Sequence, residues 1–410
     1  ALSSAASDVY KRQELFMDKK RQVIIVGGGA SGLTAGIMAA RNGAAVTILE
    51  QNEKPGRKIC VTGNGRCNLT NQDMSWKYFH GEHPEFAKKI LAQFSLEDTL
   101  RFFDELGIVV IEKKGWLYPR GGQAKYIPEL LLLRARSLKV KIKTREKVLK
   151  IYKEQNTWKV QTEGWTYEGD AVILANGSKA SKVPGSDGSG YVLAEELGHS
   201  VLRPLPALTG LKAKGNFFSS WAGVRTEGKV TLWIDGEVSD SETGELQLTE
   251  YGISGIPVFQ ISGAAARALD QKKKVSVTLN FFPEYTETAV RELLLEREKK
   301  YPELSAAERL LGLLPDKLIK VLQKQKDLCM AMTAFPLEIK GTSGFEQAQV
   351  CTGGVDTTEI NPETLESLLC QGLHFAGELL DIDGPCGGYN LQWAWSSGAV
   401  AGRYAAKEQR

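Results

Sequence analysis

The sequence has few of the residues that build disulfide frameworks and metal sites. Six cysteines are scattered over 410 residues, no two of them form a C-x-x-C pair, and there are four histidines. This usage excludes the dense disulfide framework of a small secreted domain and favours a reducing, cytoplasmic setting without bound metal. Uninterrupted apolar runs of about 18 residues are also absent, so we expect no transmembrane helix and no membrane partner.

Neither sign of charge dominates. There are 52 Lys and Arg residues against 49 Asp and Glu residues, a net charge of +3, and the two signs are interspersed. Without a basic block we expect no nucleic-acid partner. With 42% hydrophobic and 25% charged residues, the composition is that of a globular protein of two or three domains.

The first residues look foreign to the rest of the chain. The segment 1–13 lacks the apolar run of a secretion signal, and its end, DVYKRQ, resembles translated adapter sequence. Met17 stands directly before Asp18 and the first expected strand. We therefore expect residues 1–16 to be a non-native leader.

Glycine, by contrast, is abundant, with 42 residues gathered in clusters. The apolar run 23–26 is followed by G-x-G-x-x-G at Gly27, Gly29 and Gly32, an expected helix over 30–42 and a strand that ends at Glu50. In this context the glycines permit a tight turn and close backbone approach to a pyrophosphate at the helix N-terminus, and the acid accepts hydrogen bonds from ribose hydroxyls. The pattern predicts an adenine-dinucleotide site; a nucleotide-free loop is the alternative.

Two later strands favour FAD over NAD as the dinucleotide. The run 172–175 continues into Asn176 and Gly177, and the run 373–376 continues into Gly377 and Glu378. In order, these resemble the "ATG" strand and the C-terminal G-D/E strand of flavoproteins with two dinucleotide folds, where the acid holds the flavin ribityl chain. Each strand alone is also compatible with an ordinary buried strand end.

Longer stretches resemble one particular family. They are VIIVGGGASGLTAGIMAARNG (23–43), GRKICVTGNGRCNLTN (56–71), LGHS (197–200), YGISG (251–255) and the block from 351 to 402 that contains GELLDIDGPCGGYNLQWAWSSG. They follow the same order as in the BaiN-like, or aminoacetone oxidase-like, bacterial FAD-dependent oxidoreductases of the HI type, which are related to bile-acid-reducing flavoenzymes. The resemblance covers nearly the whole chain.

The resemblance implies an α/β fold: a Rossmann-like FAD-binding domain of the glutathione-reductase type, with an inserted β-barrel-like domain and a helical subdomain. The implied division is the FAD-binding domain at 17–195, the β-rich insert at 196–265, the helical subdomain at 266–328, a return of the β-rich domain at 329–344, and the second part of the FAD-binding domain at 345–410.

Motifs and resemblance together predict the FAD contacts. These are Gly27, Gly29, Ala30, Ser31, Gly32, Glu50, Gln51, Arg57, Lys58, Asn64, Cys67, Asn68, Val148, Ala175, Asn176, Gly177, Gly377, Glu378, Asp383, Gly388, Asn390 and Leu391. The last three lie where a helix is expected to begin near Leu391, and a helix N-terminus offers free N–H groups and a positive dipole end to a reduced flavin. A glycine-rich turn that caps a core helix is the alternative.

Catalytic side chains are harder to identify. The family commonly has histidine in T-H-x-G-x-S-G-P, but this chain has Glu250 there, so a mechanism that uses that histidine does not apply. Tyr251, Ser254 and Tyr389 are the candidate catalytic residues, against the alternative of tyrosines packed between domains. Cys60 and Cys67 have a C-x6-C spacing, wider than the pair of disulfide reductases, so a redox disulfide is disfavoured.

The leading hypothesis is an FAD-dependent oxidoreductase. It would reduce an activated C=C of a hydrophobic, steroid- or bile-acid-like substrate, or a small carbonyl substrate, by hydride from flavin N5. NADH or NADPH would be a transient electron donor; another donor is the alternative, with oxygen or another flavoprotein as the redox partner. One alternative is a small-amine oxidase that produces peroxide; another is a non-catalytic flavin-binding interaction protein. The sequence has no second G-x-G-x-x-G motif followed by a strand that ends in an acidic residue. It therefore does not indicate a separate NAD(P)H site.

Overall fold

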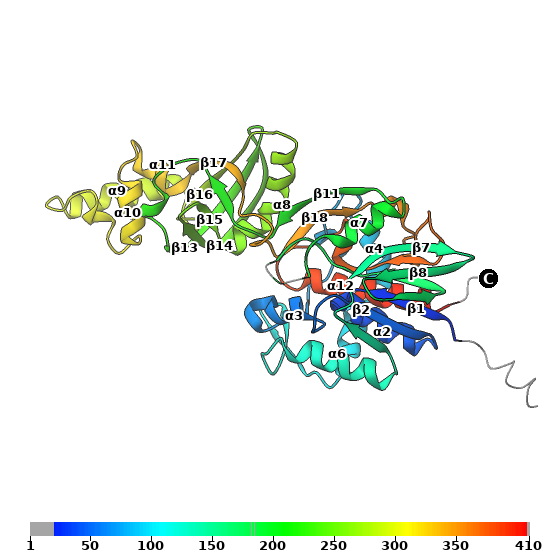
Figure 1. Cartoon of the computed structure of the whole chain (residues 1–410). Coiled ribbons are helices and arrows are strands. Elements are labelled where there is room, and N and C mark those ends of the chain that lie inside the picture. Colours follow the sequence, from blue (N-terminus) through cyan, green and yellow to red (C-terminus); the bar gives the residue numbers. More distant parts are fainter. Residues whose placement is uncertain (1–19, 182, 184, 408–410) are drawn as a thin grey trace, which may run out of the picture.

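The computed structural model describes residues 20–181, 183 and 185–407. The chain forms a rounded part, which contains the first and last described segments, and an elongated part built from its middle (Figure 1). The expected leader, residues 1–16, lies outside the described residues. Within the described ranges no helix is long and apolar enough to cross a membrane, and no cluster of three or more His, Cys, Asp or Glu side chains could hold a metal ion.

A five-stranded parallel sheet lies at the centre of the rounded part. Its order is β19-β10-β1-β2-β6, formed by β1 (Gln22–Val26), β2 (Ala45–Glu50), β6 (Lys141–Thr144), β10 (Ala171–Leu174) and β19 (Leu373–Phe375). β1, β10 and β19 are apolar and almost wholly buried, as expected for parallel strands covered on both faces. The predicted Rossmann-like α/β fold is confirmed, and the segments before and after the inserted barrel meet where β10 pairs with β19.

Helices α2 (Ala30–Arg41) and α12 (Tyr389–Ala405) pack directly on each other. Small residues allow this close approach: a Cβ added at Gly398 would lie 2.4 Å from the Ser31 carbonyl oxygen, and one at Gly402 would lie 2.2 Å from that of Ala35. α12 begins at Tyr389, slightly before the predicted start at Leu391.

Two smaller sheets and several helices complete the rounded part. One is an antiparallel meander of β7 (Val148–Glu154), β8 (Thr157–Thr162) and β9 (Thr166–Gly169). The other pairs β4 (Val110–Lys113) with β5 (Trp116–Pro119), and β5 also pairs with the two-residue strand β3 (Thr70–Asn71). The further helices are α3 (Arg57–Val61), α4 (Phe86–Gln93), α5 (Leu96–Asp104), α6 (Tyr126–Ser137) and α7 (Ser189–Glu196).

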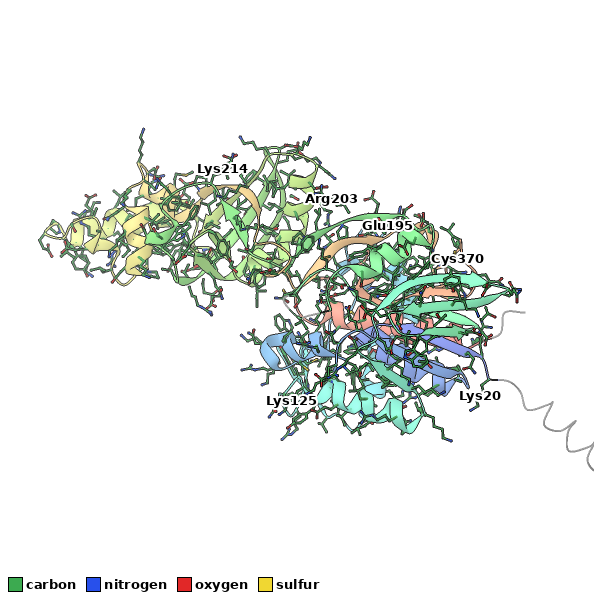
Figure 2. The ribbon with its side chains drawn as sticks, in the orientation of Figure 1. Lys20, Lys125, Glu195, Arg203, Lys214 and Cys370 are labelled. Atoms are coloured by element: carbon green, nitrogen blue, oxygen red, sulfur yellow. The ribbon has the colours of Figure 1, made fainter. Side chains whose placement is uncertain are left out.

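The antiparallel strands β11 (Val201–Ala207) and β18 (Val350–Val355) lie between the two parts (Figure 1). Beyond them the predicted barrel is confirmed as a closed barrel of order β12-β15-β14-β13-β16-β17. Its strands are β12 (Leu211–Ala213), β13 (Arg225–Ile234), β14 (Glu237–Thr249), β15 (Gly252–Ser254), β16 (Val275–Asn280) and β17 (Phe335–Thr342). Side chains on this junction and barrel, Arg203 and Lys214 among them, are drawn in Figure 2.

The barrel extends further along the chain than the expected division. β16 lies inside the range 266–328 expected for the helical subdomain, yet it pairs with β13 and β17, because Val275, Val277 and Leu279 alternate inward with the period of a strand. The helices α9 (Glu287–Lys300), α10 (Asp316–Leu322) and α11 (Leu328–Thr333) follow it. They share one hydrophobic core with the barrel, so the two form a single packed unit, with α8 (Ile256–Asp270) facing the rounded part.

Candidate flavin site

The glycine motif builds a cradle at the start of α2. Gly27 has φ +103°, and a Cβ there would lie 2.4 Å from the Ala175 carbonyl oxygen, while one at Gly32 would lie 1.9 Å from that of Gly27. A Cβ at Gly29 would meet no atom within 4 Å. Gly29 caps α2 without a side-chain bond, so the first N–H groups of the helix, including that of Ala30, face open space suited to an anion.

Residues from three other segments meet this cradle. The Cα of Asn176 lies beside Gly27, and the Oδ1 atom of Asn176 is buried without a partner among the described residues. Gly377 contacts Ser31, since an added Cβ would lie 2.5 Å from the Ser31 hydroxyl oxygen. Gly377 is held in turn by α12, through the Ser397 hydroxyl that accepts from its N–H at 2.9 Å.

A partly buried ion pair stands beside the cradle. The Lys58 ammonium lies 2.6 Å from the Glu378 carboxylate, which also accepts from the Ser178 hydroxyl at 3.1 Å. The side chains are 29% and 17% exposed, so the pair is screened less than a surface pair. Sequence reasoning missed Ser178, although it follows Gly177 directly, because a lone serine after a strand carries no pattern of its own.

The acid at the end of β2 is buried and oriented. Glu50 is 7% exposed; its Oε2 atom accepts from the Gly28 N–H at 2.8 Å, and its Oε1 atom accepts from the backbone and side-chain N–H groups of Asn52 at 2.8 and 2.7 Å. Each carboxylate oxygen has two lone pairs, which leaves acceptor capacity for a ribose.

The other predicted FAD contacts near the end of β2 have different surroundings. Val148 begins β7 and is buried. The Gln51 side chain donates to the Gly185 carbonyl at 2.9 Å. Arg57 contacts Asn52 at 3.4 Å from an exposed position.

The loop after α3 has an unusual backbone. Gly63, Asn64, Gly65 and Cys67 all have positive φ, at 55°, 53°, 78° and 59°. Such a run of left-handed residues is costly and concentrates at functional sites. The loop presents Asn68, which is 7% exposed and whose Oδ1 and Nδ2 atoms are both buried with no hydrogen-bond partner in the part of the chain that the structure describes. An unpaired buried amide is unfavourable unless a ligand completes it.

The N-terminus of α12 lies against the same loop. Gly388, its cap, has φ +98° and packs on Thr70, where an added Cβ would lie 2.5 Å from the backbone. The amide of Asn390 is used by the chain, since it both accepts from and donates to the Gly384 backbone, at 2.9 and 2.6 Å. The backbone N–H groups of the first turn, including that of Leu391, have no acceptor within the helix.

The three candidate catalytic residues do not converge. The Tyr389 hydroxyl donates to the Asp73 carbonyl at 2.9 Å, and burial raises its pKa to about 12. Ser254 is buried in β15, whereas Tyr251 is 38% exposed beside Gly210 and Ser343. The structure thus gives Tyr389 a packing role between segments and leaves Tyr251 accessible on the barrel.

Cys60, Cys67 and two of the histidines have surroundings typical of structural residues. Cys60 and Cys67 are free thiols, and burial raises the pKa of Cys67 to about 12, which disfavours a thiolate. Both ring nitrogens of His199 have partners, Glu359 at 3.1 Å and Ser367 at 2.9 Å. His374 is buried in β19, and burial lowers its pKa to about 4.

A carboxyl group that is not among the predicted site residues lies at the junction between the rounded part and the barrel. Glu242 on β14 is partly buried, and its burial, with Asp240 nearby, raises the pKa of its carboxyl group. Its charge acts on Cys386, whose backbone N–H donates to the Gln260 side chain of α8 at 2.7 Å. The barrel therefore contacts the loop that leads into α12. The sequence did not indicate Glu242, because a single acidic residue in a long polar strand belongs to no recognisable motif.

The chemistry of these residues fits a bound FAD. The open space at Gly29 suits a diphosphate, the buried Asn68 amide has no hydrogen-bond partner among the described residues, and the uncapped start of α12 suits an electron-rich flavin edge. Fold and site together define a class: an oxidoreductase flavoprotein built on a Rossmann-like FAD-binding domain.

Comparisons with known proteins agree with this class. Residues 21–404 match the model of the HI0933-like protein Rossmann domain. The chain is 46% identical to the 3-dehydro-bile acid delta(4,6)-reductase of Clostridium scindens, over 93% of this chain and 98% of that protein. It is 30% identical to the ribosomal RNA dihydrouridine synthases of Haemophilus influenzae and Escherichia coli, over 93% and 91% of this chain and 97% and 95% of theirs. The chain belongs to the HI0933-like family, and the resemblance found in the sequence is confirmed.

Proposed function

We propose that this protein uses FAD and NADH or NADPH to reduce an activated C=C bond in a hydrophobic, steroid-like substrate. The observation that carries the proposal is the 46% identity, over almost the full length of both chains, to a protein named as a bile acid delta(4,6)-reductase. The site supports it, because its open cradle and uncapped helix start suit the two ends of FAD.

The chain's own residues bind and orient the cofactor in this proposal. The first turn of α2 and Gly29 hold the diphosphate, Glu50 holds a ribose, and Glu378 holds the ribityl chain with Lys58 fixing the carboxylate. When bound, FAD supplies hydride chemistry at its N5 atom. The start of α12 would offer its free N–H groups and positive dipole end to an electron-rich edge of the bound flavin. Gln51, Arg57, Asn64, Cys67, Val148 and Asn390 are further proposed FAD contacts, on the strength of the family resemblance.

Reduction of a C=C bond also needs a proton donor. Glu242 is our first candidate, because it is partly buried at the junction beside the loop before α12, where burial and Asp240 raise the pKa of its carboxyl group. Tyr251 and Ser254 of the same barrel are the alternatives. Tyr389 ranks below them, since its hydroxyl already donates to the Asp73 carbonyl.

A second candidate function is reduction of uridine in ribosomal RNA. Two relatives at 30% identity over nearly their whole length are named ribosomal RNA dihydrouridine synthases, and forming dihydrouridine also saturates a C=C bond. The steroid-like substrate is preferred because the identity to the bile acid reductase is higher, 46% against 30%, and because the net charge of +3 does not single out RNA as a partner.

Product analysis separates the candidates. The FAD-loaded protein is incubated without oxygen with NADH or NADPH and either 3-oxo-4-ene and 3-oxo-4,6-diene steroids or unmodified ribosomal RNA, and the products are measured by mass spectrometry. We expect two hydrogens to be added to the steroid enone. Dihydrouridine in the RNA with unchanged steroids would replace the first proposal with the second. Peroxide from small amines, with no reduction of either substrate, would instead identify an oxidase.

A further inference from the structure

A small cavity lies between the two parts of the molecule, beside the loop that leads into α12. Its volume is about 160 Å³. Three segments form its walls: α8, with β11 beside it; β14; and the loop 383–385, where His80 also reaches it. This volume holds a few water molecules or one functional group and is smaller than typical pockets for whole small molecules.

One buried carboxylate lines this cavity and has one oxygen without a hydrogen-bond partner. It belongs to Asp383, whose side chain is 6% exposed. Among the described residues its buried Oδ1 atom accepts no hydrogen bond, although the Arg267 guanidinium lies 4.0 Å away; its Oδ2 atom lies 3.7 Å from the Nδ1 atom of His80. Its backbone is fixed, because its N–H and carbonyl pair with those of His80 at 3.1 and 2.7 Å. A rigid buried acceptor without a donor is costly unless a ligand supplies one.

The guanidinium of Arg267 completes a donor–acceptor pair. Arg267 projects from α8 and donates to the Thr352 hydroxyl, and the guanidinium has further N–H donors. The rest of the lining is mixed: Ala207, Leu208 and Ala264 are apolar, whereas Ser239, Asp240 and Gln260 are polar. The Asp383 acceptor and the Arg267 donor are therefore about a hydroxyl's width apart in a cavity of mixed polarity.

We propose that this cavity anchors a hydroxyl group at the far end of a hydrophobic carbocyclic substrate, with the hydroxyl donating to Asp383 and accepting from Arg267. A hydroxyl both donates and accepts, as the pair requires. A carboxylate would be repelled by Asp383 and Asp240, both of which line the cavity. The inference rests on the proposed function for the carbon skeleton, and it assigns to Asp383 a substrate contact in place of the FAD contact expected from the sequence.

The location suits this role. The loop that contains Asp383 reaches Gly388, the cap of α12, after four further residues, and Gln260 of α8 holds it through Cys386. A substrate with one end in the cavity would extend its other end toward the start of α12, where the flavin is proposed to lie.

Equilibrium binding tests the proposal without turnover. The full-length, oxidised, FAD-loaded protein is titrated calorimetrically, with no NADH or NADPH, against androst-4-en-3-one and its 17-hydroxyl derivative. We expect the hydroxylated steroid to bind about tenfold more tightly, the value of one hydrogen bond to a charged group. Asp383→Ala should abolish this preference, and Asp383→Asn, which keeps an acceptor of the same shape, should retain a reduced preference.

Asp270→Asn is the matched control. Asp270 lies on α8 one turn from Arg267 but pairs with Arg203 at 2.5 Å, so the variant should keep the tenfold preference. The FAD content of each variant establishes that it is folded. Equal affinities in the wild type, a preference that survives Asp383→Ala, or no binding of either steroid would overturn the proposal. The binding experiment involves no catalysed step, so its failure can be told apart from failure of the proposed function. A protein that reduces enones but binds the two steroids equally refutes only this inference. A protein that prefers the hydroxylated steroid but reduces no enone refutes only the proposed reductase.

Discussion

At the scale of single residues, the Lys58–Glu378 pair is the most specific feature of the flavin site. Glu378→Gln removes the carboxylate that accepts from both Lys58 and Ser178 and leaves a partly buried ammonium without its counter-ion. We expect FAD to bind about ten- to a hundredfold more weakly, as for a lost charged hydrogen bond. Fluorescence titration of the apoprotein with FAD measures this.

Glu105→Gln is the control for that variant. Glu105 pairs with Arg41 at a similar distance, 2.7 Å, but its side chain is 45% exposed. Pairs of this kind contribute about 0–1 kcal/mol, and the residue is remote from the cradle. Unchanged FAD affinity in Glu378→Gln would remove Glu378 from the cofactor site.

The pH dependence of substrate reduction depends on Glu242 if this residue donates the proton. Only the protonated carboxyl can donate, so the rate should be highest below its raised pKa and should fall as pH rises through it. Glu242→Gln should slow reduction by about 10²–10⁴-fold and remove this dependence. The rate at which substrate reoxidises the reduced flavin, followed by stopped-flow absorbance across pH, measures both effects.

A neighbouring acid of β14 provides the comparison. Glu237→Gln, at the exposed start of the same strand, should keep the wild-type rate and pH profile. If Glu242→Gln also keeps them, Tyr251→Phe becomes the next variant to measure.

At the scale of elements, the contact between α2 and α12 connects the two ends of the chain to the site. Gly398→Ala would place a Cβ 2.4 Å from the Ser31 carbonyl oxygen, so the helices must separate. We expect a loss of about 1–3 kcal/mol in the free energy of unfolding and weaker FAD binding, because Ser31 belongs to the first turn of α2. Chemical denaturation with and without FAD measures both.

A second glycine tests whether the effect is steric. A Cβ at Gly164 would meet no atom within 4 Å, so Gly164→Ala should leave stability and FAD affinity unchanged. Equal stability of Gly398→Ala and the wild type would contradict the close helix contact.

The elements that the sequence predicted well are those with a strong local pattern. The glycine motif between β1 and α2, and the strands that end before Asn176 and Gly377, stand where expected. β3 and β11 were missed, because a two-residue strand has no period and β11 contains two prolines. β16 belongs to the barrel although it lies in the range expected for the helical subdomain, because its partners β13 and β17 are paired through contacts that are distant in the sequence.

At the scale of the whole molecule, the cofactor end of the site was more predictable than the substrate end. Gly27, Glu50 and Glu378 belong to recognisable motifs, so their meeting follows from the Rossmann topology. Arg267 and Asp383 meet only because α8 of the barrel packs against the loop before α12. No local pattern encodes that contact, because it depends on how the inserted barrel is placed on the FAD-binding domain.

The central claim is that the protein transfers electrons from a nicotinamide to an enone through FAD. The most direct measurement is an anaerobic titration of the FAD-loaded protein with NADH and NADPH, followed by addition of a 3-oxo-4-ene steroid, while the visible absorbance of the flavin is recorded. The account predicts rapid bleaching by one of the two nucleotides and full return of the absorbance on addition of the steroid. A flavin that stays oxidised with both nucleotides would contradict it.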